Sequence, residues 1–135
     1  EFVRYGVMHK NTYMNSPQLL DNKFNLRSDK RFYFAGQMTG VEGYVESAAS
    51  GLMAGLHAAR AALELEAVEF PSETAHGALA NYISNPEVKE FQPMNVNFGL
   101  IPPLTQRIRK KREKNAMIAA RSLEQLDILK EKYNI

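Results

Sequence analysis

The amino-acid sequence predicts an α+β chain that is mostly helical. Two segments predict helix: residues 46–66 are almost all small or apolar with a thin polar stripe, and residues 105–133 place apolar side chains at helical spacing. The aromatic-rich segment 31–35 predicts a short buried strand, because it runs directly into a glycine-rich stretch. With 135 residues, 44% of them hydrophobic and 24% charged, the chain has the composition of one ordinary globular domain.

The strongest local signal is the succession of a strand, a glycine-rich turn and a helix. We expect the strand at residues 32–35, the turn at 36–43 and the helix at 46–66. The free N–H groups and partial positive charge of a helix N-terminus can hold a phosphate or an electron-rich carbonyl oxygen. The spacing G-x-x-x-G-x-x-G matches neither the dinucleotide fingerprint nor the phosphate-binding loop, so a tight packing turn is an equal alternative.

We expect the helix at 46–66 to be buried on most of its sides. Between residues 48 and 65 the polar side chains form one narrow stripe, which is typical of a buried helix, and they are Ser50, His57, Arg60 and Glu64. Gly51 and Gly55 lie off this stripe, and their spacing would let a strand or a ligand approach the helix axis. His57 and His76 are nevertheless both expected at the surface.

The second half of the chain is expected to be a helical region. We therefore divide the chain into a first unit at 1–70 and a second unit at 71–135. Ser72 is the expected cap of a helix at 73–84. The segment 91–103 is expected to be an ordered loop because its apolar residues can anchor it, and long anchored loops are more often functional than disordered.

Positive charge is concentrated near the end of the chain. Residues 105–135 hold nine basic and four acidic side chains, whereas residues 1–104 hold 8 basic and 11 acidic ones. We expect Thr105 to cap a last helix that begins with a basic segment, residues 107–114. The six basic side chains of this segment are Arg107, Arg109, Lys110, Lys111, Arg112 and Lys114. Such a run suggests contact with a polyanion such as nucleic acid, and a solvated helix face is an equal alternative.

Several classes of site and segment are excluded by the composition of the chain. There is no cysteine, so the chain holds no disulfide, no cysteine-ligated zinc and no cysteine nucleophile. Histidines and carboxylates do not occur at spacings typical of a metal site. No apolar run is long enough for a membrane span, and no signal-peptide pattern opens the chain, so a cytoplasmic setting is expected. The first residue is Glu1, which suggests that the chain is part of something larger.

Three separated motifs resemble one protein family. They are FAGQMTGVEGYVESAASGL at 34–52, RYGVMHKNTY at 4–13 together with NSP at 15–17, and FQPMNVNFGL at 91–100. In this order they are similar to the TrmFO/Gid family of bacterial folate- and FAD-dependent tRNA (uracil-5-)-methyltransferases, and the resemblance covers nearly the whole chain. It implies that the chain is the C-terminal part of an FAD/NAD(P)-binding α/β fold of the glutathione-reductase kind, followed by a C-terminal helical region.

The resemblance also implies a reaction. The family takes a methylene group from methylenetetrahydrofolate and reduces it through FAD with NAD(P)H as electron source. The methyl group is placed on carbon 5 of the T-loop uridine of tRNA. The expected partners are therefore tRNA and the N-terminal part of the same protein, with no membrane contact and with a homo-oligomer left open.

Site residues follow from the resemblance position by position. Gly36 and Gln37 would line the FAD chain, and the helix start would face the pyrimidine edge of the flavin, where developing negative charge is stabilised. The full set assigned to the cofactor is Gly36, Gln37, Gly40, Glu42, Gly43, Tyr44 and Val45. His9 and Asn11 are expected near folate or flavin. The basic residues Arg107, Arg109, Lys110, Lys111, Arg112 and Lys114 are expected to contact tRNA.

The sequence also departs from the family. The N-terminal G-x-G-x-x-G unit and the reactive cysteines of the family are absent, so no catalytic residue is assigned here. We expect a C-terminal fragment that is inactive alone. Two alternatives stay open: a fragment of a GidA-type enzyme that modifies the tRNA wobble uridine, and a helical RNA-binding module without a cofactor.

Overall fold

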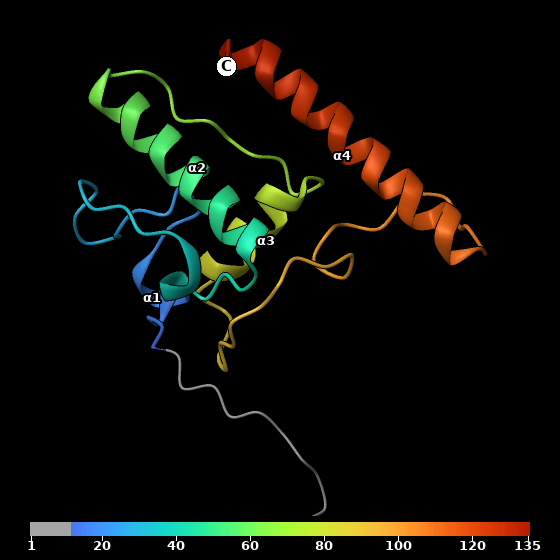
Figure 1. The fold of residues 1–135 in the computed structure, drawn as a ribbon, viewed down its shortest axis with the longest axis horizontal. Coiled ribbons are helices and arrows are strands. Elements are labelled where there is room, and N and C mark those ends of the chain that lie inside the picture. The colour runs from blue at the N-terminus through green and yellow to red at the C-terminus, as the bar shows by residue number, and fades with distance from the viewer. Residues whose placement is uncertain (1–11) are drawn as a thin grey trace, which may run out of the picture.

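The computed structural model describes residues 12–135 and is mostly helical, as the sequence predicts. The elements in chain order are α1 (Ser16–Leu19), the 3₁₀ helix η1 (Gly36–Thr39), α2 (Tyr44–Ala62), α3 (Ala75–Ser84) and α4 (Lys111–Tyr133). The two long helices α2 and α4 run in the same general direction (Figure 1). α3 packs against α2, and its Ala78 contacts Ile118 of α4, so α3 joins the two long helices.

The main hydrophobic core lies between α2, α3 and the segments that flank them. It contains residues from both sides of position 70, so the two expected units share it, and the division of the chain at 70 stays a prediction. The largest contributors are Phe24, Val41, Met53, Leu79, Ile83 and Phe91. A smaller cluster of Val68, Leu129 and Tyr133 holds the C-terminal end of α4.

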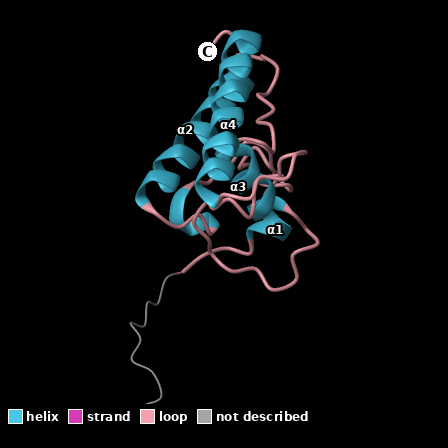
Figure 2. Cartoon of the chain, turned by 90° about the vertical axis from the view of Figure 1, so that its right-hand side faces the viewer, coloured by secondary structure: helices cyan, strands magenta, loops and turns pink. Residues whose placement is uncertain are grey.

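The strand expected at residues 32–35 is not formed. Within residues 12–135 the β-structure is limited to isolated bridges, and Figure 2 draws no strand there. Tyr33 bridges Asn25, and the Phe34 N–H donates to the Phe24 carbonyl at 2.9 Å, so this segment pairs on one side only. The pairing stops at once because the chain enters η1 at Gly36.

α2 forms where the sequence predicts it but is buried on the opposite face. Ser50 and His57 of the polar stripe are 2% and 3% exposed, whereas Leu52 is 70% exposed. The expectation of a helix buried on most sides is therefore wrong for the part of the chain that the structure describes. The polar stripe can face inward because the Ser50 hydroxyl is hydrogen-bonded to backbone groups on both sides.

Two helix starts differ from the expected ones. α3 is capped by Thr74, whose side chain accepts a hydrogen bond from the Gly77 N–H at 2.9 Å, so Ser72 is not the cap. α4 begins at Lys111 and not after Thr105, with no side-chain cap at Lys110. Lys110, Lys111 and Arg112 therefore lie at the N-terminus of α4, where cations are unfavourable beside the free N–H groups. The capping signal of Thr105 is not used.

The expected loop at 91–103 is present and is anchored along its length. Phe91 and Ile101 are buried, and Met94 bridges Val41 in parallel register. The loop thus reaches the glycine-rich turn from a distant part of the sequence.

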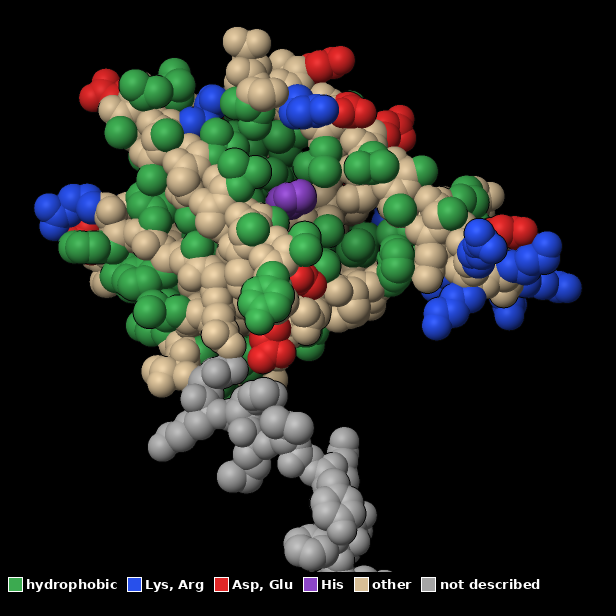
Figure 3. Space-filling view, in the orientation of Figure 1, with side chains coloured by type: hydrophobic (Ala, Val, Ile, Leu, Met, Phe, Trp, Pro, Cys, Tyr) green, Lys and Arg blue, Asp and Glu red, His purple; other side chains and the backbone are tan. Residues whose placement is uncertain are grey.

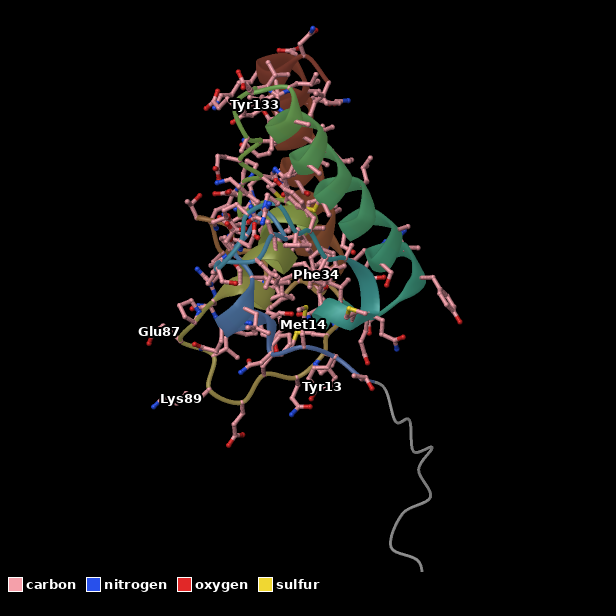
Figure 4. All side chains as sticks on the ribbon, turned by 90° about the vertical axis from the view of Figure 1, so that its left-hand side faces the viewer. Tyr13, Met14, Phe34, Glu87, Lys89 and Tyr133 are labelled. Carbon is pink, nitrogen blue, oxygen red and sulfur yellow. The ribbon has the colours of Figure 1, made fainter. Side chains whose placement is uncertain are left out.

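The end of α4 lies far from the first described residues. Tyr133, at the end of α4, lies at the end of the molecule opposite Tyr13 (Figure 4).

Candidate functional site

The glycine-rich turn links η1 to the start of α2 and depends on two left-handed glycines. Gly40 ends η1 at φ +83°, and Gly43 precedes α2 at φ +88°. Side chains other than glycine rarely adopt such backbone angles. A Cβ atom at Gly43 would also overlap the side chains of Glu46 and Asn95. Glycine at this position therefore lets the Glu46 and Asn95 side chains lie against the backbone at the helix start.

Buried hydroxyl groups hold the turn against the body of the protein. The Gly36 N–H donates to Ser50 Oγ at 2.8 Å, and Ser50 Oγ donates to the Ser47 carbonyl at 2.8 Å. On the other side, Thr39 Oγ1 donates to the Gly36 carbonyl and Ser16 Oγ donates to the Thr39 carbonyl, each at 2.8 Å. Since Ser16, Thr39 and Ser50 are all buried, these bonds fix the path of the turn with little freedom.

The loop at 91–103 is hydrogen-bonded to the other edge of the turn. The Met94 N–H donates to the Gly40 carbonyl at 2.9 Å, and the Glu42 N–H donates to the Met94 carbonyl at 3.0 Å. Asn95 Nδ2 donates to Glu46 Oε1 at 3.3 Å. Sequence reasoning did not assign Phe91, Met94 or Asn95 to this site, because they lie about fifty positions along the chain and carry no local signal of the contact.

The start of α2 is uncapped and open. Among residues 12–135, no side chain accepts a hydrogen bond from its first N–H groups, and Tyr44 and Val45 are 98% and 80% exposed. The first N–H groups of a helix lack partners within the helix and carry partial positive charge. This helix start can therefore donate hydrogen bonds to an electron-rich oxygen of a planar ligand, with the Glu46 and Asn95 side chains beside it.

A cavity of about 420 Å³ adjoins the same helix start. Its walls are mainly apolar and come from α2, α3 and the loop at 91–103, with Glu46, Ser50 and His76 as the polar side chains. The apolar walls include Phe24, Val45, Met53, Leu79 and Val96. Size and lining are those of a pocket that accepts a flat, largely apolar ring system.

The structure brings together the residues assigned to the cofactor. Gln37, Gly43, Tyr44 and Val45 are exposed along one arc of backbone, and Gly36 and Glu42 are half-buried beside it. Gly40 is buried, and a Cβ atom there would overlap the ring of Phe91, so this glycine is required for packing. His9 and Asn11 lie outside the residues that the structure describes.

The basic residues form a surface apart from the turn. Arg107, Arg109 and Lys110 precede α4, and Lys111, Arg112 and Lys114 lie in its first turn, so only half of the segment is helical. All six are exposed, and Lys110 pairs with Glu113 at 3.1 Å. Figure 3 shows the resulting cluster of Lys and Arg side chains at one end of the molecule.

His57 is buried, so the surface position expected for it is wrong, whereas His76 is half-buried. His57 is 3% exposed, and neither of its ring nitrogens has a hydrogen-bond partner among residues 12–135. The ring of Phe70 lies between the two histidines, with centroids 5.9 Å from His57 and 5.7 Å from His76. Burial lowers the pKa of both imidazoles below the ordinary value.

Two further searches of the described part gave no site. Across residues 12–135, no three His, Asp or Glu side chains gather closely enough to hold a metal ion. None of the helices in that same range combines the length and the apolar character that crossing a membrane requires.

Comparison with known proteins finds one matching family model and several similar curated proteins. Residues 1–66 match the family model described as glucose inhibited division protein A. The chain is 56% identical over 131 residues to a protein of Pelotomaculum thermopropionicum named methylenetetrahydrofolate–tRNA-(uracil-5-)-methyltransferase TrmFO. It is equally similar to the protein of that name from Lactiplantibacillus plantarum, and 59% identical over 124 residues to the one from Enterococcus faecalis.

These alignments cover almost all of this chain but a small part of the relatives. The three matches include 97%, 97% and 92% of this chain. They include only 30%, 30% and 28% of the relatives. The chain therefore spans less than a third of the length of the curated relatives that it matches.

Proposed function

We propose that this chain, a homologue of part of the TrmFO proteins, forms part of a flavoenzyme that methylates carbon 5 of the T-loop uridine in tRNA. The observation that carries the proposal is the 56–59% identity over 92–97% of the chain to proteins with that named activity. On this proposal the chain is the C-terminal part of an FAD/NAD(P)-binding α/β fold of the glutathione-reductase kind, located in the cytoplasm. The isolated chain is inactive because the reactive cysteines belong to the N-terminal part.

The turn at 36–45 is the proposed contribution of this chain to the FAD site. Gly36 and Gln37 line the FAD chain, and the backbone N–H groups of the α2 start face the pyrimidine edge of the flavin. Three observations support this assignment: the left-handed glycines, the uncapped helix and the adjoining apolar cavity. When bound, FAD supplies a carrier for the two electrons that the methylation consumes. The α2 N-terminus favours negative charge at that edge through its partial positive charge.

The other substrates are assigned less directly. Methylenetetrahydrofolate, the proposed carbon donor, is named in the relatives, and NAD(P)H as electron source follows from the family resemblance. His9 and Asn11 remain predicted contacts of folate or flavin. Gly40 and Glu42 support the turn through Met94, and both remain predicted contacts of FAD.

The basic segment is the proposed contact of this chain with tRNA. Its six exposed cations include one, Lys110, that pairs with a neighbouring carboxylate. Exposed cations of this density bind the phosphate backbone through counterion release. A homo-oligomer stays open, and no membrane partner is proposed.

One alternative has a specific observation in its favour. The family model that matches residues 1–66 is described as glucose inhibited division protein A, so a GidA-type enzyme acting on the wobble uridine is the second candidate. The names of the relatives favour the first. A helical RNA-binding module without a cofactor is the third candidate, and the open α2 start argues against it.

The test uses the full-length protein that contains this chain, together with FAD, NAD(P)H and tRNA transcripts. The methylene carbon of methylenetetrahydrofolate carries an isotopic label. We expect the label to appear in 5-methyluridine at the T-loop, as read by mass spectrometry of nuclease fragments. Label at the wobble position would favour the second candidate, and no label in tRNA would contradict the methyltransferase assignment.

A further inference from the structure

A second cavity, of about 500 Å³, lies between α4, the start of α3 and the loop at 91–103. Its lining is apolar except for Asn97 and Ser122. Two large apolar side chains on its walls are open to solvent, since Phe98 is 45% exposed and Leu123 is 64% exposed. We call this cavity the α4 groove. An apolar groove with exposed large side chains on its walls is suited to a ligand with a flat face.

The walls of the α4 groove are firmly held. Ala78, Ile101 and Ile118 form a buried cluster that fixes α4 against α3 and the loop. The Arg121 guanidinium donates to the carbonyls of Pro102 and Pro103, the latter at 3.1 Å, and so ties α4 to the loop end.

The loop tip that carries Phe98 is also held in place. The Gly99 N–H donates to Asn97 Oδ1 at 2.9 Å, and Asn97 Nδ2 donates to the Asn95 carbonyl at 3.2 Å. The turn that carries Phe98 is therefore fixed by hydrogen bonds. As a result, the loop loses little conformational entropy when a ligand contacts the Phe98 ring.

The face of α4 that lines the groove also carries a basic residue near the start of the helix. Arg112, Ala119 and Leu123 follow one another at spacings of seven and four residues, which places them on one helix face. Arg112 lies seven residues before Ala119, which is about 10 Å along the helix axis. A ligand seated in the groove would thus have the basic segment at one end.

A third hollow, of about 290 Å³, lies within the basic segment itself. Arg107 and Lys114 supply two cations to its lining, and Thr105 and Gln106 supply hydrogen-bonding groups. This lining suits a phosphate group, which takes charge-assisted hydrogen bonds from Arg and Lys. The hollow and the α4 groove share no lining residue, but Lys114 of the hollow lies five residues before Ala119 of the groove, about 7 to 8 Å along the helix axis. Together they offer the two chemistries that a nucleotide requires, an apolar surface for a flat base and cations for its backbone.

We propose that the α4 groove binds one unpaired base of tRNA against Phe98, while Arg107 and Lys114 hold the adjoining backbone phosphates. Charge complementarity selects RNA as the occupant, because residues 107–114 carry six cations and the single carboxylate of Glu113. Base–aromatic stacking beside a positive groove is how many proteins hold unpaired nucleotides. This inference rests on the proposed function and adds a contact to it that lies apart from the flavin turn.

The experiment measures tRNA binding by the full-length protein in fluorescence anisotropy, with a tRNA transcript and a fully paired RNA duplex as probes. Phe98→Ala should weaken tRNA binding about tenfold and leave duplex binding unchanged, because a duplex offers no unpaired base to stack. Phe98→Tyr should bind tRNA as the wild type does. Phe32→Ala is the matched control, since Phe32 is 53% exposed and also lies beside an arginine, Arg31.

The phosphate contact has its own readout. The Arg107→Ala and Lys114→Ala double variant should reduce the slope of log affinity against log salt by about 1 to 2, whereas Phe98→Ala should leave that slope unchanged. Lys89→Ala is the control, because this exposed lysine lies two positions after Glu87 and lines neither the α4 groove nor the cationic hollow (Figure 4). Thermal unfolding of each variant checks that the fold is intact.

The groove proposal and the methyltransferase proposal fail in different ways. If tRNA is methylated but Phe98→Ala and Phe98→Tyr both bind tRNA like the wild type, the groove proposal is overturned. If Phe98→Ala weakens tRNA and duplex binding equally, base stacking is overturned as well. Loss of tRNA binding in Phe98→Ala, in a protein that does not methylate tRNA, would support the groove and count against the proposed reaction.

Discussion

The ring of Phe91 lies against Gly40 and fills the space that a side chain at residue 40 would need. The two residues are about fifty positions apart, and the backbone around them pairs through Val41 and Met94. The glycine-rich turn is therefore shaped as much by the loop at 91–103 as by its own sequence.

Substitution of Gly40 should be costly. Gly40→Ala adds a Cβ atom at φ +83° that overlaps the Phe91 ring, and left-handed strain and overpacking each cost roughly 1 to 3 kcal/mol. We expect a loss of about 2 to 4 kcal/mol of unfolding free energy in urea denaturation of the chain. Gly55→Ala is the control, because nothing lies within 4 Å of a Cβ atom there and the helix should gain about 0.5 to 1 kcal/mol. Equal effects of the two substitutions would contradict the packing role of Gly40.

The Ser50 hydroxyl should be the most sensitive polar group of the turn. Ser50→Ala leaves the Gly36 N–H without its acceptor, which should cost about 1 to 3 kcal/mol of unfolding free energy. Ser47→Ala should cost less, because its hydroxyl makes a longer bond of 3.4 Å to the Val41 carbonyl. Urea denaturation of both variants compares their losses of unfolding free energy. A larger loss for Ser47→Ala than for Ser50→Ala would contradict this prediction.

His57 should make the chain less stable in mild acid. Burial lowers its pKa, with Lys23 and Arg60 adding to the shift and Glu69 and Asp21 opposing it. The unfolded chain therefore takes up a proton near the ordinary histidine pKa of 6.5 while the folded chain does not.

The sign of the effect follows from that difference in proton uptake. Unfolding free energy should fall as the pH drops below about 6.5, by at most about 1.4 kcal/mol per pH unit for one proton. His57→Leu removes this proton uptake and should flatten the decline between about pH 7 and 5. If the unfolding free energy of His57→Leu falls with pH as steeply as that of the wild type, His57 is not the cause of the lower stability in mild acid.

Flavin affinity should depend on the backbone of the α2 start. Gly43→Ala strains the backbone at φ +88° and brings a Cβ atom against Glu46 and Asn95, so FAD binding to the full-length protein should weaken about tenfold or more. Tyr44→Phe keeps every backbone N–H group and should bind FAD as the wild type does. Titration followed by flavin fluorescence compares the two, and unchanged binding by the Gly43 variant would count against the turn as an FAD contact.

The sequence predicted the long helices because their apolar spacing and glycine content are local properties. It did not predict which face of α2 is buried, since that depends on what packs against the helix and on the hydrogen bonds that Ser50 finds. The start of α4 was missed because a residue able to cap a helix, such as Thr105, does not by itself decide where the helix begins. The turn is also contacted by Phe91, Met94 and Asn95. This is a contact between distant segments, which no local sequence pattern predicts.

A crystal structure of the full-length protein with FAD tests most directly whether the α2 start closes on the flavin. We expect the pyrimidine edge of the flavin to accept hydrogen bonds from backbone N–H groups at residues 43–46. A flavin bound elsewhere, with the start of α2 facing solvent or another part of the protein, would contradict it.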